Sequence, residues 1–464
     1  MKYFTIRGTG NEIMHTEKYK GLIRKLIRLF FIVVFELAFM YVWFSDINGL
    51  KLQPFENKGN WLMAAVYLVE MVLLLRVYGG FKIGHLERWN VILSQGLSLV
   101  ICNSIMTVQI ILMVGDMHLI GEILKSIVLL TIADIVISIV FVNLFDSILQ
   151  KLYPPKKILL VYESYSPQSM ICKFQKRKDK YEIRETISID MEWERLKETV
   201  SGYSNILLYD ISSEKRNELL KFCYINNIEV YMTTKLSDTI IRGAGNVLLF
   251  DSPLLHIPNQ RMSKGQRIAK RALDLAVGVP MFMVALPIMA VVAICIKCYD
   301  GGPAFYTQER CTLNGKRFMI YKFRSMVVNA EGDGKARLAA ENDKRITPVG
   351  QFIRKTRLDE LQQLNNVLKG EMSIVGPRPE RPEMIAEYEK KIPEFSCRLK
   401  VKGGLTGYAQ IYGKYNTTPY DKLKMDMMYI QNYSFLLDIK LILMTAKVIF
   451  MKESTEGVYE EKRQ

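Results

Sequence analysis

Residues 272–296 have the sequence ALDLAVGVPMFMVALPIMAVVAICI, a nearly unbroken apolar run. A helix of this length can cross a bilayer core of about 30 Å. Pro287 lies near its middle, where proline removes a backbone hydrogen bond and bends a helix. Both flanks are basic, with Lys264, Arg267, Lys270 and Arg271 before the run and Arg310, Lys316, Arg317, Lys322 and Arg324 after it. Because basic flanks favour the cytoplasmic side, we expect a re-entrant helix, with a plain fifth span as the alternative.

The composition indicates a membrane protein that handles phosphate groups. The chain has 464 residues, 49% of them hydrophobic, and 63 Lys and Arg against 47 Asp and Glu give a net charge of +16. The basic residues cluster at membrane boundaries, without a recognised nucleic-acid module, which favours lipid and phosphate over nucleic acid as partners. The seven cysteines are odd in number and scattered along the chain, which argues against a disulfide framework. This pattern fits a protein of a reducing compartment.

Four further apolar stretches precede residues 272–296 in the chain. They cover about Leu26–Phe44, Trp61–Tyr78, Trp89–Val114 and Leu119–Phe145, and each is long enough for a transmembrane helix. Lys and Arg are concentrated before the first stretch, after the second and after the fourth. The positive-inside rule therefore places both ends of this bundle, residues 1–150, in the cytoplasm.

Five charged side chains lie inside these stretches: Glu36, Glu70, Glu122, Lys125 and Asp134. A charge at the centre of a bilayer costs roughly 2.5–3.5 kcal/mol on insertion scales, so we expect each to face another helix. Two interpretations remain open, hydrogen bonds within the bundle and a pathway for a lipid head group, and the first is favoured.

Residues 151–262 contain short β-rich runs that alternate with polar helical ones. The β-rich runs are KILLVY, YEIRETI, NILLYD, IEVYMTT and NVLLFD. This alternation predicts a parallel sheet with crossover helices, a Rossmann-like α/β module. The turn after the first strand, YESYSPQS, has no GxGxxG, the glycine pattern that brings backbone amides against a pyrophosphate. We therefore predict a degenerate module with a structural, regulatory or dimerising role.

The candidate chemistry lies between Gly302 and Gly413. DELQQLNNVLKG, residues 359–370, predicts a short helix that Gly370 ends, with Asp359 and Glu360 in its first turn. The helix dipole and free amides there favour ionised carboxylates and bound phosphate. Arg354 and Arg357 precede the pair closely.

Additional cations surround this segment in the sequence. In GPRP, residues 376–379, Arg378 stands between two rigid prolines, which suits a bidentate grip on phosphate. Lys322 and Arg324 in YKFRSM add two positive charges. Cations, a carboxylate pair and a nearby membrane together indicate phosphoryl transfer with a divalent ion.

These segments resemble the bacterial polyprenyl-phosphate glycosyl-1-phosphate transferases, the bacterial sugar transferase family. The matching pieces are KRALDL with the proline-broken helix, TQER, KFRSM, TPVGQFIRKTRLDELQQLNNVLKGEMSIVGPRP and GGLTGYAQ, over about residues 265–452. The bundle and the Rossmann-like module resemble the amino-terminal extension of the long members. Three positions depart from the family pattern: Leu286 before Pro287, Cys311-Thr312 after QER, and Gln362 after the acidic pair and leucine.

The resemblance implies transfer of sugar 1-phosphate from a UDP-hexose, galactose or glucose first, to undecaprenyl phosphate, which starts capsule or exopolysaccharide synthesis. It implies that Asp359 is the nucleophile, that Glu360 holds Mg²⁺, and that Arg354 and Arg378 bind phosphate. Lys270, Arg271 and Asp274 either meet the lipid phosphate and lock the helix to the catalytic domain or act as interfacial anchors. Tyr408 and Gln410 are candidates for nucleotide contact, although a structural turn explains GGLTG equally well.

We therefore expect a multi-pass protein of the bacterial inner membrane with a cytoplasmic α/β catalytic domain at residues 263–452 and a polar tail at 453–464. Asp438, Lys440 and Lys447 interrupt the last apolar segment, which predicts a helix lying in the membrane interface. A homodimer is plausible on the size of the amino-terminal extension. The alternative function is a membrane scaffold of polysaccharide assembly that has lost turnover.

Overall fold

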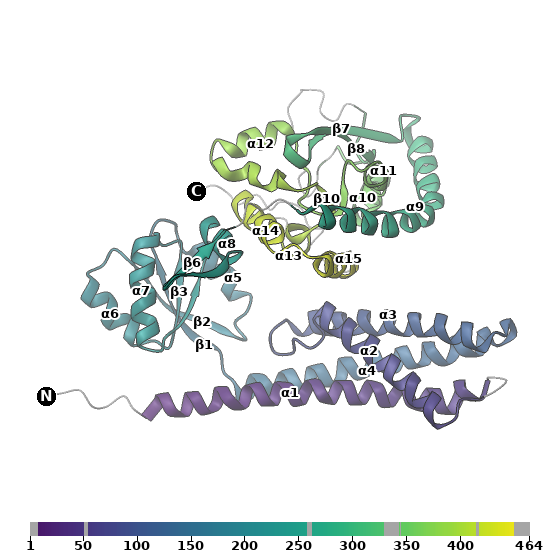
Figure 1. Ribbon diagram of the computed structural model, residues 1–464, viewed down its shortest axis with the longest axis horizontal. Coiled ribbons are helices and arrows are strands. Elements are labelled where there is room, and N and C mark those ends of the chain that lie inside the picture. The colour runs from purple at the N-terminus through teal and green to yellow at the C-terminus, as the bar shows by residue number, and fades with distance from the viewer. Residues whose placement is uncertain are drawn as a thin grey trace. The chain divides into compact units, whose positions relative to one another are not determined.

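The structure is a computed structural model, shown in Figure 1. It describes residues 8–50, 54–257, 262–328, 343, 345–413 and 417–449. The predicted polar tail at 453–464 lies outside these residues. The chain divides into two compact units, Met1–Thr233 and Thr234–Gln464. The division falls inside the predicted 151–262 module, and each unit is described by itself.

Four long apolar helices form where the sequence predicted them. They are α1 (Gly8–Val42), α2 (Asn57–Tyr78), α3 (Arg88–Val114) and α4 (Ile120–Leu152), with short helices η1 (Trp43–Ile47), η2 (Asn48–Leu50) and η3 (Met117–Leu119) in the connections. Gly79 and Gly115 end α2 and α3 with φ of 82° and 70°, a left-handed conformation that glycine adopts without strain. By length and composition, each long helix can cross a membrane.

The charged residues of these helices do not all face another helix. Asp134 is fully buried and Glu70 accepts a hydrogen bond from Gln109 Nε2 at 2.6 Å. Glu122 and Lys125, in contrast, are exposed in the first two turns of α4. The expectation of an inward orientation was therefore wrong for these two, because they lie at a helix end, where a side chain can reach the interface.

A four-stranded parallel sheet completes the first unit, as predicted. Its strands are β1 (Lys156–Tyr162), β2 (Tyr181–Ser188), β3 (Asn205–Tyr209) and β4 (Glu229–Met232), in the order β2-β1-β3-β4, with α5 (Gln168–Gln175), α6 (Trp193–Ser201) and α7 (Ser213–Ile225) as crossovers. β1 and β3 are buried along their centres, which explains their unbroken apolar runs.

Glu163 occupies the carboxyl edge of this sheet, where open α/β sheets usually bind ligands. It directly follows β1 and accepts hydrogen bonds from the backbone N–H and the hydroxyl of Ser212, at the start of α7. Lys215 lies 3.1 Å from the same carboxylate. A side chain thus takes the anion position that a phosphate occupies at the corresponding helix start of nucleotide-binding folds.

NVLLFD does not extend the parallel sheet, and that prediction was wrong. Its residues form β5 (Gly245–Leu249), which pairs antiparallel with β6 (Ser252–His256) in a separate hairpin. The preceding helix α8 (Leu236–Arg242) packs against α14 (Pro419–Gln431), with the Leu236 N–H donating to the Tyr420 hydroxyl at 3.2 Å. Apolar alternation alone does not distinguish a sheet strand from a hairpin strand.

The second unit is an α/β domain wrapped by one long helix, α9 (Lys264–Asp300). Besides the β5–β6 hairpin, its strands form two short ribbons, β7 (Phe305–Cys311) with β8 (Arg317–Phe323) antiparallel, and β9 (Ser373–Val375) with β10 (Gly404–Thr406) parallel. The remaining helical elements are η4 (Leu313–Gly315), α10 (Pro348–Lys355), η5 (Leu358–Glu360), α11 (Gln363–Lys369), α12 (Pro382–Glu389), η6 (Pro393–Lys400), α13 (Tyr408–Tyr412) and α15 (Phe435–Ile449).

Helix α9 is sharply bent, so that its two halves follow two sides of this domain (Figure 1). Pro280 and Pro287 lie inside it. One face is buried along the whole length: Lys270, Asp274, Gly278, Ala285, Met289, Val292 and Ile296. At its start Lys270 bonds within the domain, and at its end Asp300 pairs with Arg324. Both ends of the apolar helix therefore contact the same folded unit.

Helix α15 packs into the second unit and buries two of its charged side chains, Asp438 and Lys447. Asp438 is 1% exposed and lies 2.8 Å from Lys270 Nζ. Tyr429 donates a hydrogen bond to the other oxygen of Asp438 at 2.8 Å. These contacts hold one face of α15 in the domain, and the position of the segment in the membrane interface stays a prediction.

The contacts at both ends of α9 predict that residues near Asp300 face the cytoplasm. Cys298 is an exposed native thiol on α9. In a variant that keeps only Cys298, we expect a membrane-impermeant maleimide to label inside-out vesicles but not intact cells. His118→Cys, in the exposed loop between α3 and α4, is the control that should be labelled on intact cells. Labelling of Cys298 from outside would contradict the re-entrant arrangement.

Candidate active site

Asp359 and Glu360 lie in a tight turn that two helices hold in place. Thr347 caps the start of helix α10, and its hydroxyl accepts a hydrogen bond from the Gly350 N–H at 2.9 Å. Arg357 then adopts a left-handed conformation with φ of 58°, which turns the chain into η5. The predicted single helix is therefore divided, and the carboxylates precede α11 instead of starting it. Gly370 ends α11 with φ of 82°, as predicted.

Asn366 fixes α11 to the neighbouring strand. Its side-chain amide donates to the Met319 carbonyl at 2.8 Å and accepts from the Tyr321 N–H at 3.1 Å. Both partners belong to β8, and Asn366 is fully buried. A buried, satisfied carboxamide of this kind makes the spacing between helix and strand rigid. Lys322 directly follows Tyr321 on β8 and is thereby held against the carboxylates.

Glu360 is the permanently ionised member of the pair. Its Oε1 accepts a hydrogen bond from Arg378 Nη2 and lies 4.0 Å from Arg357 Nη1. Burial alone would raise the pKa of Glu360, but the charges of Arg378 and Lys322 outweigh burial and hold the pKa well below its usual range. The Glu360 side chain is 13% exposed and that of Arg378 is 36% exposed, so part of the Arg378 side chain is open to solvent.

Asp359 has the opposite electrostatic balance. Burial and the negative charge of Glu360 raise the pKa of Asp359 to about 6, although Lys322, Arg378 and Arg354 act in the other direction. The surroundings thus raise the pKa of one carboxyl and lower the pKa of its neighbour. At neutral pH Asp359 is mostly ionised but has no dedicated hydrogen-bond partner in the described part of the chain, so its oxygens are free to act as a nucleophile.

Lys322 adds a cation that is sensitive to pH. Burial, followed by repulsion from Arg378, lowers the pKa of Lys322 to about 8, while Glu360 and Asp359 partly restore it. The structure thus brings together the predicted residues Asp359, Glu360, Lys322 and Arg378, with Arg354 close enough to influence Asp359. One carboxylate pair is thus surrounded by cations, and these cations can bind a phosphate group.

The Arg378 loop is held by a network that the sequence did not reveal. Arg398 donates to the backbone carbonyl of Arg378 at 2.9 Å and lies 2.8 Å from Asp426 Oδ2 and 3.5 Å from Glu380 Oε1. Arg310 donates to the carbonyl of Pro379 at 3.1 Å. Arg398 and Asp426 are 3% and 1% exposed. Two arginines thus grip successive carbonyls of the loop and fix where the Arg378 side chain points.

One signal of this network is visible in the sequence. Asp426 is an acid on the apolar face of α14, among Leu423, Met427 and Ile430. A charged residue at such a position requires a buried partner. The sequence did not reveal that the partner is Arg398, which lies in η6.

Arg324 is not part of the carboxylate site. Its Nη2 pairs with Asp300 at the end of α9, and its side chain is 9% exposed. Gly302 makes room for it, since a Cβ on Gly302 would lie 2.1 Å from Arg324 Nη1. The predicted phosphate-binding role has no support in these contacts, which instead fasten the end of α9 to β8.

The three charged residues at the start of α9 lock the helix to the domain. Lys270 Nζ donates to the Val375 carbonyl, the Tyr429 hydroxyl and Asp438, at 2.8, 3.0 and 2.8 Å. Arg271 donates to the Val367 and Leu368 carbonyls at 2.6 and 2.7 Å, at the end of α11. Asp274 Oδ1 accepts from the Ser373 hydroxyl and the Ile374 N–H at 2.8 and 2.9 Å.

These contacts match the locking role predicted for Lys270, Arg271 and Asp274. All three protons of Lys270 are used inside the protein, so its ammonium is not directed at a lipid phosphate here. Pro287 lies in the second half of α9, away from these anchors along the chain.

Tyr408 and Gln410 belong to α13 and lie beside the glycine-rich backbone of the Arg378 loop. Tyr408 packs on Tyr412, with ring centroids 4.9 Å apart. Both polar atoms of the Gln410 carboxamide are enclosed, without a hydrogen-bond partner in the described residues. Gly407 and Gly376 approach so closely that a Cβ on Gly407 would lie 2.2 Å from the Gly376 carbonyl oxygen. The glycines of GGLTG are therefore needed for backbone contact.

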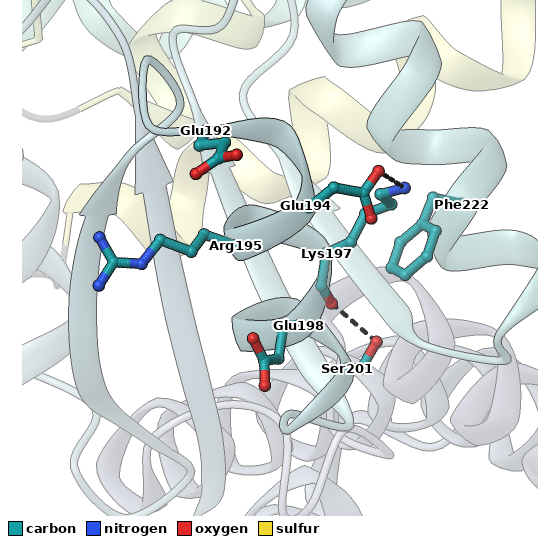
Figure 2. Close-up of a pocket in the computed structure, with 7 residues that line it drawn as sticks. All are labelled: Glu192, Glu194, Arg195, Lys197, Glu198, Ser201 and Phe222. Carbon is teal, nitrogen blue, oxygen red and sulfur yellow. Dashed lines mark hydrogen bonds and ion pairs between the residues drawn. The ribbon is translucent and has the colours of Figure 1, made fainter. Parts of the chain in front are cut away.

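A surface depression elsewhere in the chain has different chemistry. Figure 2 shows it between α6 and α7 of the first unit, lined by Glu192, Glu194, Arg195, Lys197, Glu198, Ser201 and Phe222. Lys197 Nζ bonds to Glu194 Oε1 at 2.5 Å, and the Ser201 hydroxyl donates to the Lys197 carbonyl at 2.7 Å. Its charges largely compensate one another on a helical surface, and none belongs to the predicted site.

The fold and the site together define a class: an α/β domain clasped by a bent apolar helix, with a buried carboxylate pair among cations. Comparison with known proteins agrees. Residues 265–452 match the family described as bacterial sugar transferase. The matched range is the one that the sequence motifs predicted.

Several curated proteins are similar to this chain. A UDP-N-acetylgalactosamine-undecaprenyl-phosphate N-acetylgalactosaminephosphotransferase of Aeromonas hydrophila is 34% identical over 52% of this chain and 56% of its own length. A UDP-glucose:undecaprenyl-phosphate glucose-1-phosphate transferase of Klebsiella pneumoniae is 35% identical over 54% and 53%. Galactosyl transferase CpsE of Streptococcus agalactiae is 44% identical over 40% and 42%. The chain thus matches about half the length of these relatives.

The Arg398 network predicts a loss of turnover without loss of folding. Arg398→Lys keeps a positive charge beside Asp426 but cannot hold the Arg378 carbonyl and Glu380 at once, because an ammonium lacks the guanidinium fork. A displaced Arg378 should lower kcat by roughly 10- to 100-fold, with a smaller change in KM. The measurement is steady-state kinetics beside thermal unfolding. Arg317→Lys, at an exposed arginine of β8, is the matched control.

Wild-type kcat in Arg398→Lys would show that the Arg378 loop does not need this support. Equal losses of kcat and of folded protein would assign Arg398 a purely structural role.

Proposed function

We propose that the chain transfers a sugar 1-phosphate from a UDP-sugar to undecaprenyl phosphate and releases UMP. The observation that carries this proposal is the adjacent carboxylate pair with divided acidity, Asp359 raised and Glu360 lowered, inside a cluster of cations. The match of residues 265–452 to the bacterial sugar transferase family supports it, as do relatives named for the same class of reaction.

The proposed reaction has two displacements at one phosphorus atom. A carboxylate oxygen of Asp359 attacks the phosphate next to the sugar, a new P–O bond forms to Asp359, and the P–O bond to UMP breaks. A phosphate oxygen of the lipid then attacks the same phosphorus, and the bond to Asp359 breaks. This gives undecaprenyl-diphosphate-sugar and restores the carboxylate. Each step exchanges one P–O bond for another, so a single difficult displacement becomes two easier ones.

Arg378, Lys322 and Arg354 would bind the phosphate oxygens and orient them toward Asp359. Arg378 suits this role because its side chain is partly exposed while its backbone is fixed by Arg398. Lys322 contributes a point charge, and its proximity to Asp359 keeps that carboxyl ionised at neutral pH. The donor's diphosphate would thus be held by cations before any bond forms.

Glu360 is the residue we propose to hold Mg²⁺. It remains ionised and has a carboxylate neighbour, and Mg²⁺ typically binds through one or two carboxylates together with substrate phosphates. The donor set therefore fits the ion. When bound, Mg²⁺ would neutralise charge on the phosphate oxygens.

We also propose that α9 is a re-entrant helix and that the catalytic domain lies on the cytoplasmic face of the bacterial inner membrane. Its two ends contact one domain, and basic residues flank both ends. The domain would then meet the UDP-sugar in the cytoplasm and the lipid phosphate at the membrane surface. A homodimer remains a prediction.

Galactose and glucose are the sugars we propose first, with N-acetylated sugars next. The relatives are named for glucose, galactose and N-acetylgalactosamine, so the sugar must be assigned by assay. The product would begin the membrane stage of capsule or exopolysaccharide assembly.

Purified membranes carrying the chain should release UMP from at least one UDP-sugar in the presence of undecaprenyl phosphate and Mg²⁺. Asp359→Asn and Glu360→Gln should each abolish release while the protein still inserts, because one removes the nucleophile and the other the ionised metal ligand. Glu309→Gln, at an exposed carboxylate of β7, is the matched control. An absence of UMP with every UDP-sugar would favour the inactive scaffold.

The two displaced pKa values predict a bell-shaped pH profile for kcat/KM. Asp359 must be ionised, so activity should fall below about pH 6, and loss of the Lys322 proton should lower it above about pH 8. Lys322→Arg keeps its charge across this range and should remove the alkaline limb but not the acidic one. Lys369→Arg on α11 is the control. An unchanged alkaline limb in Lys322→Arg would exclude Lys322 as its origin.

A further inference from the structure

Basic side chains gather where the first apolar helix meets the α/β module of the first unit. Lys20, Arg24 and Arg28 follow one another at intervals of four residues, so they share one face of α1. His85, in the connection between α2 and α3, and Lys180, directly before β2, lie close to that face. We call these five residues, Lys20, Arg24, Arg28, His85 and Lys180, the basic cluster.

His85 lies within the electric field of all four cations of the cluster. Burial, and then the charges of these four side chains, lower the pKa of His85 to about 4, so its imidazole is neutral at neutral pH. Lys180 is affected by its neighbours in the same direction. Burial and the charges of Arg177 and Arg24 lower the pKa of Lys180 to about 8, although two nearby aspartates act in the other direction.

Direct contacts hold the α/β module against the helices at this place. Arg177 Nη1 donates to the His85 carbonyl at 2.9 Å, and the same guanidinium bonds to both carboxylate oxygens of Asp179 at 2.9 Å. Lys20 Nζ lies 4.9 Å from the centre of the Tyr153 ring, directly after α4. The cluster therefore joins α1, the connection between α2 and α3, the end of α4 and the module.

The carboxylates closest to Lys180 already have other partners. Asp179 is paired with Arg177, and Asp146 accepts a hydrogen bond from Arg88 Nε at 2.6 Å. In the described part of the chain, Lys180 forms no ion pair with a carboxylate, and the same holds for Arg28 on α1. Like charges held together repel one another, and burial strengthens the repulsion because it lowers the local dielectric constant. Arg28 and Lys180 therefore lack an anion.

The position of the cluster along α1 indicates where such an anion would come from. Arg28 is directly followed by the apolar part of the helix, whose side chains Leu29, Val33 and Leu37 are exposed. In a membrane helix, exposed apolar side chains of this kind contact the acyl chains of lipids. Cations next to such a stretch lie at the level of the head groups, where they attract anionic lipids.

We propose that the basic cluster binds the phosphate group of an anionic membrane lipid, whose chains lie along α1. A phosphate can accept charge-assisted hydrogen bonds from several cations at once. Because Arg28 belongs to a membrane helix and Lys180 to the α/β module, the bound phosphate holds the module to the bundle. The cluster lies in the first unit and the carboxylate pair in the second, so the proposal does not depend on the transfer reaction.

Thermal unfolding of the full-length protein in a neutral detergent tests this site. Phosphatidylglycerol should raise the unfolding temperature of the wild type, whereas phosphatidylcholine, which has no net charge, should not. Undecaprenyl phosphate and inorganic phosphate are added in parallel. If undecaprenyl phosphate acts at lower concentration than phosphatidylglycerol, the ligand is a phosphomonoester lipid, and the reverse order identifies a phospholipid. An equal effect of inorganic phosphate would overturn the lipid as the ligand.

Arg28→Gln combined with Lys180→Gln removes two charges from the cluster. The concentration of anionic lipid that gives half of the temperature shift should rise about 25-fold, or about five-fold for each charge. Arg195→Gln combined with Lys221→Gln is the matched control. It removes the same two kinds of charge from exposed positions on α6 and α7 and should respond to lipid like the wild type.

The cluster variant also distinguishes lipid binding from a purely structural role. Without added lipid it should unfold at the same temperature as the wild type or at a higher one, because the loss of like charges relieves repulsion. Lower stability with an unchanged response to phosphatidylglycerol would overturn the proposal. Equal effects of phosphatidylglycerol and phosphatidylcholine on the wild type would also overturn it. UMP release by the same variant reports separately on the proposed transfer reaction.

Discussion

The pairing of Glu360 with Arg378 is the interaction on which the rest of the site depends. Two adjacent carboxylates cannot both be ionised and buried at neutral pH without compensation, because desolvation costs several kcal/mol for each charge. Arg378 bonds directly to Glu360 and keeps it ionised. Asp359 then carries the full effect of burial and of its charged neighbour. The site therefore contains one permanent anion and one carboxylate poised near its pKa.

The position of Arg378 is determined by residues remote in sequence. Arg398 and Arg310 hold the carbonyls of its loop, and Asp426 anchors Arg398 in the core of the domain. Arg271 binds the last carbonyls of α11 and so ties this helix, which follows Asp359 and Glu360, to the start of α9. The geometry of the carboxylates and the attachment of the apolar helix α9 are thus parts of one packed structure.

The sequence predicted the elements whose evidence is local. The long apolar runs gave α1–α4 and α9, and adjacent residues in short motifs gave Asp359, Glu360 and Arg378. It failed where a charge finds a distant partner. The sequence did not reveal that Arg324 pairs with Asp300 or that Asp438 bonds to Lys270. Such pairs depend on tertiary packing, which periodicity does not encode.

The division of the acidic segment shows the same limit. Its apolar spacing and Gly370 correctly predicted a helix end, but the left-handed Arg357 moved Asp359 and Glu360 into a separate turn. A positive φ at arginine has no signal in sequence, since it arises from the packing of α10 and α11 on either side. The charges that favour ionisation of the two carboxylates are those of the nearby arginines and lysine.

The central claim is that Asp359 carries the phosphosugar covalently. The most direct test is to mix the protein with a UDP-sugar labelled in its β-phosphate, without the lipid acceptor, quench it rapidly and map the label by mass spectrometry. The account predicts a phosphosugar on the peptide containing Asp359, absent in Asp359→Asn and discharged when undecaprenyl phosphate is added. Product formation with no modified Asp359 peptide at any time would contradict it.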